Sequence, residues 1–183
     1  MLNSFFKLLV LTSIILSFGC TTAKPNTQNI QLCGFNVDQY LCDIPLVDQR
    51  NICYSTDEFT NRNMIIHFMT AWSQDSCELA GVASYLQNRY ENANVIIVLL
   101  ETYTGYEIAN SSFLDDWVND CGVNVPAYTV PSEMSAYFPD RYFPVTFVVD
   151  DNLKIKAKTY GTDLVELMGT INFALHEENV FYN

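Results

Sequence analysis

The sequence predicts an α/β fold in which one sheet is covered on both faces. Of the 183 residues, 49% are hydrophobic and 14% aromatic, which is enough for one domain with a packed core. Short, nearly continuous apolar runs alternate with segments of helical periodicity, a pattern typical of buried strands connected by helices. From residue 63 the expected order is β-α-β-α-β followed by β-β-α.

The strands are expected where apolar runs have strand length, at 64–69, 94–101, 127–130, 143–151 and 153–160. Helices are expected where apolar residues recur at helical spacing, at 77–90, 111–122 and 163–178. A tight turn at Asp151-Asn152 joins the last two strands, and Gly122 ends the second helix. Upstream, "CDIPLVD" and "NICYS" flank the polar "DQRN" and predict a hairpin.

The N-terminus indicates export. One Lys precedes an apolar run from Leu8 to Phe18, which is too short for a comfortable membrane span and fits the core of a signal peptide. The following "LSFGC" resembles a bacterial lipoprotein signal, which implies that Cys20 is lipidated and becomes the first mature residue. We therefore expect a signal peptide at 1–19, the lipidated Cys20 and a tether over 20–31, and one domain over 32–183 of an extracytoplasmic, membrane-anchored protein. An ordinary secretory signal cut nearby is the alternative.

Charge and cysteine content limit the classes of partner. A formal net charge of −12 excludes nucleic acid, which needs clustered Lys and Arg, and an electrostatic grip on anionic lipid. Five cysteines follow Cys20, an odd number that predicts at least one thiol unpaired or bonded to another molecule. Their spacing, without partner histidines, does not indicate a zinc site, so we expect no metal and no cofactor. They are Cys33, Cys42, Cys53, Cys77 and Cys121.

Three stretches together resemble the thioredoxin-like fold over roughly residues 44–176, in particular its extracytoplasmic TlpA/ResA, peroxiredoxin-like and Sco-type branches. "IIHFMTAWSQDSC" resembles the first core strand and the Trp, here Trp72, that precedes the active-site turn. "FPVTFVVDDNLKI" resembles the strand that begins with a cis-proline, which implies a cis bond at Pro144. "YGTDLVELMGTI" resembles the turn into the last helix. The resemblance implies a central mixed sheet flanked by helices, with an N-terminal extension.

The active-site turn departs from each family pattern. Anchored on Trp72, the two thiols of a Cys-x-x-Cys site would fall at Ser73 and Ser76, and Cys77 comes one residue later. The Sco-type Cys-x-x-x-Cys would also place Ser73 first, and the His of its copper site is missing before the cis-proline. The Thr and Pro that precede a peroxiredoxin Cys are replaced by Gln and Thr.

Cys77 is the remaining candidate for a catalytic thiol. It lies at the start of a predicted helix, where Asp75 or Ser76 would be the N-cap and the helix terminus would favour a thiolate. The carboxylates of Asp75 and Glu78 would oppose ionisation. Cys121 is either a core thiol or a resolving partner, but in ordinary thioredoxin geometry the two positions are not neighbours, so we expect no bond between them. Cys77 can equally be a buried or structurally bonded cysteine.

Two further features have both a functional and a structural interpretation. His67 occupies the strand position at which thioredoxins carry a buried Asp, so it would be either a proton relay to Cys77 or an ordinary core residue. The aromatic residues near Pro144 would either border a groove in which the family binds extended polypeptide or simply pack in the core. These aromatics are Tyr137, Phe138, Tyr142 and Phe143.

Three functions stay open at this point. The first is a thiol-disulfide oxidoreductase or peroxidase-like enzyme that acts through Cys77, with Trp72 and Pro144 in the site. The second is a polypeptide-binding or scaffold protein that uses the groove beside Pro144 without turnover. The third is a Sco-like copper or assembly protein.

Overall fold

A seven-stranded mixed sheet forms the centre of the molecule in the computed structural model, which describes residues 33–131, 134, 137–138 and 141–176. The predicted signal peptide, Cys20 and tether lie outside the described residues. The strands follow the spatial order β4-β3-β7-β6-β5-β8-β9, in which β5, β6 and β7 are parallel and the other pairs antiparallel. They are β3 (Pro45–Val47), β4 (Cys53–Ser55), β5 (Asn63–Thr70), β6 (Ala93–Glu101), β7 (Ala127–Thr129), β8 (Val145–Val149) and β9 (Ile155–Tyr160).

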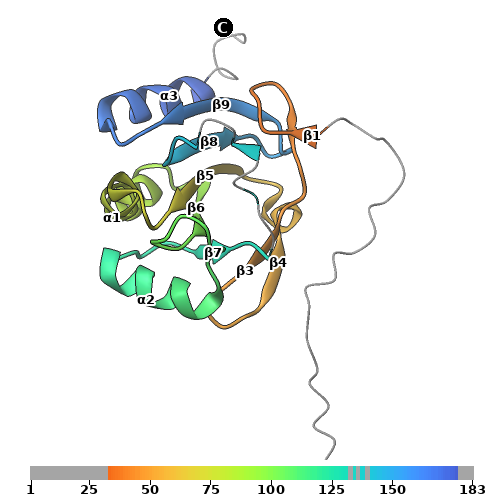
Figure 1. Ribbon diagram of the computed structural model, residues 1–183. Helices are drawn as coiled ribbons and strands as arrows, with labels where there is room; N and C mark the ends of the chain where they lie inside the picture. The colour runs from red at the N-terminus through yellow and green to blue at the C-terminus, as the bar shows by residue number, and fades with distance from the viewer. Residues whose placement is uncertain (1–32, 132–133, 135–136, 139–140, 177–183) are drawn as a thin grey trace, which may run out of the picture.

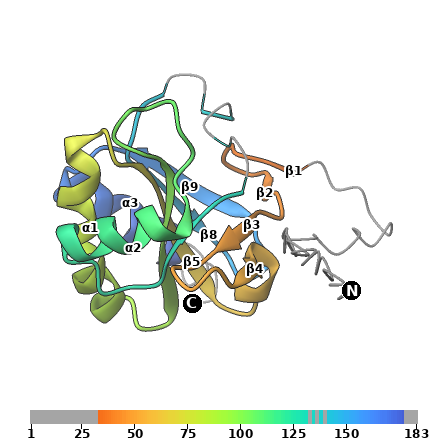
Figure 2. The ribbon, with the colours of Figure 1, turned by 60° about the horizontal axis from the view of Figure 1, so that its bottom comes forward.

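All three described α-helices lie on one face of this sheet (Figures 1 and 2). They are α1 (Gln74–Arg89), α2 (Ser111–Cys121) and α3 (Leu164–His176). Their buried residues, such as Leu79, Trp117 and Ile171, share one core with alternate residues of β5 and β6. This follows from the period of two in a strand, which sends successive side chains to opposite faces.

The second face is covered by irregular chain. Residues from the N-terminal extension, including Phe35 and Leu41, pack there with residues such as Phe138 and Phe143, which precede β8. The extension contains two very short strands, β1 (Cys33–Gly34) and β2 (Tyr40–Leu41), and a 3₁₀ turn, η1 (Thr56–Phe59), follows β4. Figure 2 shows β1 and β2 on the side of the sheet away from the helices. The sequence predicted coverage of both faces, but not that no described α-helix would lie on one of them, which we call the helix-free face.

The predicted elements are present, with shifted ends. The hairpin forms between β3 and β4, where the Asp48 carboxylate accepts from the N–H groups of Arg50 and Ile52 at 2.9 and 2.8 Å. Burial raises the pKa of Asp48, but these hydrogen bonds and the Arg50 guanidinium outweigh burial and lower the pKa overall. Helix α1 begins at Gln74 with Ser73 as its N-cap, so the predicted N-caps Asp75 and Ser76 are wrong.

Candidate functional site

The turn after β5 meets the chain that enters β8. The two strands are antiparallel neighbours, with Phe68 opposite Val145, so the end of one lies beside the start of the other. The Phe143–Pro144 peptide bond at this junction is cis. The Ser73 hydroxyl donates to the carbonyl oxygen of Phe143 at 3.0 Å. The structure therefore brings together three of the predicted site residues, since the Trp72 ring also contacts Phe143 edge-on with 6.1 Å between centroids.

Ser73 has a structural task at this junction. Its hydroxyl occupies a main-chain acceptor immediately before Pro144 and ties the start of α1 to the chain entering β8. A neutral hydroxyl without an adjacent base does not perform disulfide exchange. The Ser76 hydroxyl also has a structural hydrogen bond, because it is buried and accepts from the Thr70 N–H at 3.3 Å.

A carboxylate that the sequence did not single out organises the same region. Glu101 ends β6 and is 5% exposed, and its Oε2 accepts from the Trp72 indole N–H and from the Arg141 guanidinium, both at 2.6 Å. Arg141 also donates to the carbonyl of Gly105 at 2.8 Å and lies over the Trp72 ring, 5.7 Å from its centroid. A buried charge needs such partners. A carboxylate at the end of an apolar strand, here Glu101, was a sequence signal for a buried charge. Nothing in the sequence near Arg141 identified it as the partner.

Gly105 allows this arrangement. Its φ of +70° lies in the left-handed region, and a Cβ at this position would lie 3.1 Å from Cδ1 of Trp72. The backbone of the loop after β6 thus approaches the indole so closely that a Cβ at residue 105 would press against the Trp72 ring, and the positive φ also favours glycine.

Cys77 is disulfide-bonded to Cys121, with 5.3 Å between the two Cα atoms. The expectation that these positions are not neighbours is therefore wrong. Cys77 lies in the first turn of α1 and Cys121 ends α2, and the two helices pack on the same face of the sheet, so their ends meet. Cys77 is exposed, whereas Cys121 is half-buried against the core. No cysteine among the described residues is a free thiol, so the expected unpaired cysteine is not found there.

His67 is fully buried within β5. Its Nδ1 lies 2.8 Å from the hydroxyl of Thr146 on β8, and its Nε2 has no hydrogen-bond partner. Burial lowers the pKa of His67 to about 3, so the ring is neutral at physiological pH. In the described part of the chain no hydrogen bond connects this ring to Cys77, and the contacts favour the core interpretation.

The aromatic residues around Pro144 divide into two groups. Phe138 and Phe143 are buried in the core of the helix-free face. Tyr137 and Tyr142 are exposed, and Tyr142 packs edge-on against Tyr160 with 5.9 Å between centroids. Structural packing thus explains half of the set, and the other half faces solvent.

The exposed tyrosines border an open cleft of about 430 Å³ on the helix-free side of the sheet. Aromatic rings and two cationic side chains, Arg141 and Lys158, line it together with the loop after Cys33. The Lys158 ammonium lies 5.2 Å from the ring centroid of Phe147 and 5.1 Å from that of Tyr160. We call this space the β9 cleft.

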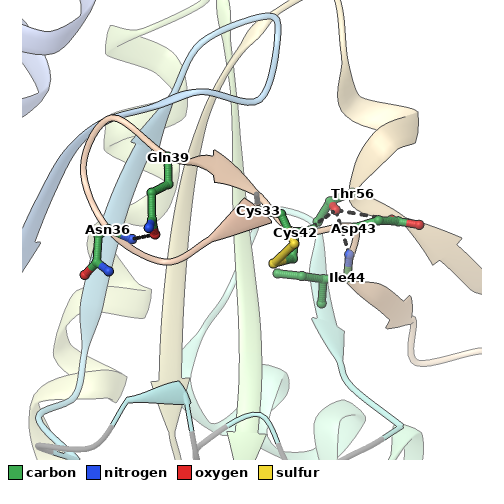
Figure 3. The surroundings of a disulfide bond; sticks show 7 residues. All are labelled: Cys33, Asn36, Gln39, Cys42, Asp43, Ile44 and Thr56. Atoms are coloured by element: carbon green, nitrogen blue, oxygen red, sulfur yellow. Dashed lines mark hydrogen bonds between the residues drawn. A yellow bond between two sulfur atoms is a disulfide. The ribbon is translucent and has the colours of Figure 1, made fainter. Parts of the chain in front are cut away.

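A second disulfide, Cys33–Cys42, closes the loop at one side of the β9 cleft (Figure 3). Within this loop Gln39 Oε1 accepts from the Asn36 N–H at 3.1 Å. On the far side of Cys42, the Thr56 hydroxyl accepts from the Ile44 N–H at 2.9 Å, which joins the extension to η1 (Figure 3). The disulfide therefore fixes the loop that borders the cleft.

Two further features are absent from the described residues. They contain no group of three or more His, Cys, Asp and Glu side chains placed to hold a metal ion. None of their helices is both long and apolar enough to cross a membrane.

Comparisons with known proteins give structural matches only. No protein-family profile and no curated protein sequence matches the chain. The thioredoxin domain of a Bacteroides vulgatus thiol-disulfide oxidoreductase superimposes with a TM-score of 0.60 at 13% identity, over 74% of this chain and 97% of that one. An exposed lipoprotein thioredoxin from Streptococcus pneumoniae gives 0.57 at 15% identity, over 72% and 98%.

A Chlorobium tepidum protein described as a candidate thiol:disulfide interchange protein DsbE gives a TM-score of 0.64 at 15% identity, over 78% of this chain and 99% of that one. Identities this low establish the fold and leave the activity to be argued from the site. The strand order, the cis-proline before β8 and these superpositions agree. The chain therefore has the thioredoxin-like fold, which these thiol-disulfide oxidoreductases share.

Proposed function

We propose that this protein is an extracytoplasmic thiol-disulfide oxidoreductase whose redox couple is Cys77–Cys121 in place of the usual Cys-x-x-Cys. One observation carries the proposal: an exposed cysteine in the first turn of α1 is bonded to a half-buried cysteine from the neighbouring helix. An attacking thiolate needs access to one sulfur, and the other must be able to leave and return. This revises the prediction of a single reactive thiol at Cys77.

The reaction is an exchange between this disulfide and a dithiol polypeptide. A substrate thiolate attacks Sγ of Cys77, the Cys77–Cys121 bond breaks, and Cys121 leaves as a thiolate. The second substrate thiolate then attacks the substrate sulfur of the mixed disulfide and releases Cys77. The substrate loses two electrons and two protons, and the two cysteines gain them. The reverse direction reduces a substrate disulfide.

The electrostatics of α1 support a thiolate at Cys77. Helical side chains point back toward the N-terminus, where the partial positive charge of the helix favours an anion. The carboxylate of Asp75, two residues earlier in the same turn, opposes this effect. In the reducing direction, where Cys77 is the attacking group, the pKa of its thiol sets the fraction present as thiolate.

We also propose that the protein is held outside the cytoplasm by a lipid on Cys20. The N-terminal sequence supports this location, and disulfides persist in oxidising compartments. One of the structural neighbours is itself an exposed lipoprotein thioredoxin.

The decisive experiment is a redox titration of the folded domain. We would equilibrate it in glutathione buffers, trap thiols by alkylation, and map each cysteine by mass spectrometry. We expect a midpoint reduction potential above about −300 mV for Cys77–Cys121, because structural disulfides have potentials below that value. Catalysis is measured as the reduction of insulin disulfides, with dithiothreitol regenerating the reduced protein. The Cys77→Ser/Cys121→Ser variant should lose this activity, and the matched Cys33→Ser/Cys42→Ser variant should keep it. A Cys77–Cys121 bond that resists reduction until the domain unfolds would refute the proposal.

A second candidate is polypeptide binding without turnover beside Pro144. Exposed aromatic side chains at Trp72 and Tyr142 favour it, because such rings supply contact area at low entropic cost. Two results together would support this candidate over the enzyme. The parent protein would reduce no disulfide, and the Cys77→Ser/Cys121→Ser variant would still bind unfolded polypeptide.

A further inference from the structure

The β9 strand is an edge of the main sheet and is only partly covered. Strand β8 pairs with one side of β9, and no other strand follows it in the sheet. On its outer side the N-terminal extension covers the first part: Asp38 N–H donates to the Ile155 carbonyl, and Ile155 N–H donates to that of Gln39, both at 2.8 Å. The extension therefore closes the edge at Ile155.

No described strand or loop pairs with the second part of this edge. Gly161 N–H donates to the Pro144 carbonyl at 2.9 Å, which makes Gly161 and Pro144 an inward-bonding pair. Bonding pairs alternate along an antiparallel ladder, so Thr159 and Ala157 also bond inward to β8. The N–H and C=O groups of Lys158 and Tyr160 consequently point outward, and neither residue makes a further backbone bond to the described chain.

The side chains of the same two residues line the β9 cleft. Lys158 is a cation without an ion pair among the described residues, in a chain of net charge −12. Lys154, by contrast, is paired with Asp38 at 2.9 Å. Tyr160 is 41% exposed and Tyr142 is 63% exposed. Open backbone groups, a cation and aromatic rings thus converge on one short stretch of strand.

We propose that this open stretch of β9 takes an extended acidic polypeptide segment as an additional strand. The main-chain groups of Lys158 and Tyr160 would pair with the segment, and alternate side chains of the segment would enter the β9 cleft. A carboxylate complements Lys158, and an aromatic ring complements Tyr142 and Tyr160. The proposal is independent of the disulfide exchange above, because Cys77 and Cys121 do not line this cleft.

Charge argues against a second copy of this chain as the occupant. Antiparallel pairing of two β9 edges would bring the lysines of both copies together, and like charges opposite one another destabilise a sheet. Lysines on an edge strand are a common device against self-pairing. An acidic segment would place a carboxylate opposite Lys158 and so avoids this repulsion between lysines.

The test uses a nine-residue probe peptide in which Ser alternates with Glu and Phe, and a control peptide with Lys in place of Glu. Amide hydrogen exchange of the domain is measured by NMR with and without each peptide. With the acidic peptide we expect exchange at Lys158 and Tyr160 to slow at least about tenfold, with Ala157 and Thr159 unchanged because they already bond to β8. The Lys158→Glu variant should bind about tenfold more weakly, and the matched Lys154→Glu variant should bind as the parent does.

Three results would overturn the proposal. One is no binding of the acidic peptide up to millimolar concentration. Another is binding that leaves exchange at Lys158 and Tyr160 unaltered, which would mean contact without strand addition. The third is protection of both amides that rises with protein concentration in the absence of peptide, which would assign the edge to self-association. In Cys77→Ser/Cys121→Ser the expected binding is unchanged, so failure of the redox proposal is distinguished from failure of this one.

Discussion

Glu101 fixes the candidate site through a single oxygen. That Oε2 accepts from Trp72 and Arg141, which come from the turn after β5 and from the segment before β8. Arg141 itself has a φ of +46°, a left-handed conformation that is uncommon outside glycine and persists where the surroundings hold it. The position of both segments therefore depends on the charge of Glu101.

Glu101→Gln tests this dependence. The amide keeps an acceptor for the Trp72 indole but removes the opposite charge from Arg141, so we expect a loss of about 1–3 kcal/mol in the free energy of unfolding. Urea titration followed by circular dichroism measures it. Glu107→Gln is the control, because Glu107 is exposed and forms no ion pair among the described residues. Equal losses in the two variants would contradict the role assigned to Glu101.

His67 gives the protein a predictable response to acid. Because burial lowers its pKa to about 3 from the usual 6.5, the unfolded chain takes up a proton over this range and the folded protein does not. The stability that the neutral ring contributes is complete above pH 6.5 and is lost as the pH falls toward 3. At pH 4.5 the loss from this one residue is about 2–3 kcal/mol.

His67→Asn removes the titration and retains a polar group for Thr146. We expect the wild type to lose about 2–3 kcal/mol more than the variant when denaturant unfolding is moved from pH 7 to pH 4.5. The comparison uses the change with pH, since the substitution also alters packing at both pH values. Parallel pH dependences would show that His67 is protonated in the folded state.

For single residues, the sequence predicted which positions belong to the candidate site better than it predicted which residues contact one another. Trp72, Ser73 and Pro144 were found because the residues around them follow a fold-wide pattern, and the structure places them together. The Cys77–Cys121 bond was missed because it depends on how α1 and α2 cross, which periodicity does not encode. The Glu101–Arg141 pair was missed for the same reason: the partners are 40 residues apart and meet only through the tertiary fold.

Among the elements, α2 has the best defined ends. The Asn110 side chain accepts from the Phe113 N–H at 2.9 Å at its start, and Gly122, with a φ of +65°, follows its last turn. Asn110→Ala should therefore destabilise the protein by about 1 kcal/mol, because a first-turn donor loses its partner. Thermal unfolding measures the loss, and Ser112→Ala, at an exposed position of the same turn, should cost less than half as much. A loss at Ser112 as large as at Asn110 would remove the capping explanation.

The sequence predicted whether a segment is a helix or a strand more reliably than it predicted on which face of the sheet that segment lies. Apolar runs in β5, β6 and β8 are long enough to indicate buried strands, and the hairpin of β3 and β4 is marked by its polar turn. Strands β1 and β2 have two residues each and carry no periodic signal. That all three helices share one face depends on the connections between strands, which hydrophobicity alone does not specify.

For the molecule as a whole, the disulfides Cys77–Cys121 and Cys33–Cys42 should differ in their contribution to stability. Cys77–Cys121 spans 44 residues and Cys33–Cys42 spans 9. On the chain-entropy account, closing the longer loop stabilises the fold by about 4 kcal/mol and the shorter one by about 2–3 kcal/mol. Urea unfolding of Cys77→Ser/Cys121→Ser and of Cys33→Ser/Cys42→Ser should give losses in that order. The reverse order would indicate that the Cys33–Cys42 loop holds more of the structure than its length implies.

The contact between Gln39 and Ile155 has a consequence for how the protein matures. A chain that is synthesised N-terminus first delivers residue 39 long before residue 155, yet each supplies a backbone hydrogen bond to the same junction. Strand β3 likewise cannot join the sheet before β7 is present, because Val47 pairs with Thr129. The helix-free face of the sheet therefore cannot close until nearly the whole polypeptide has emerged, and during that interval its apolar strands depend on chaperones for protection from aggregation.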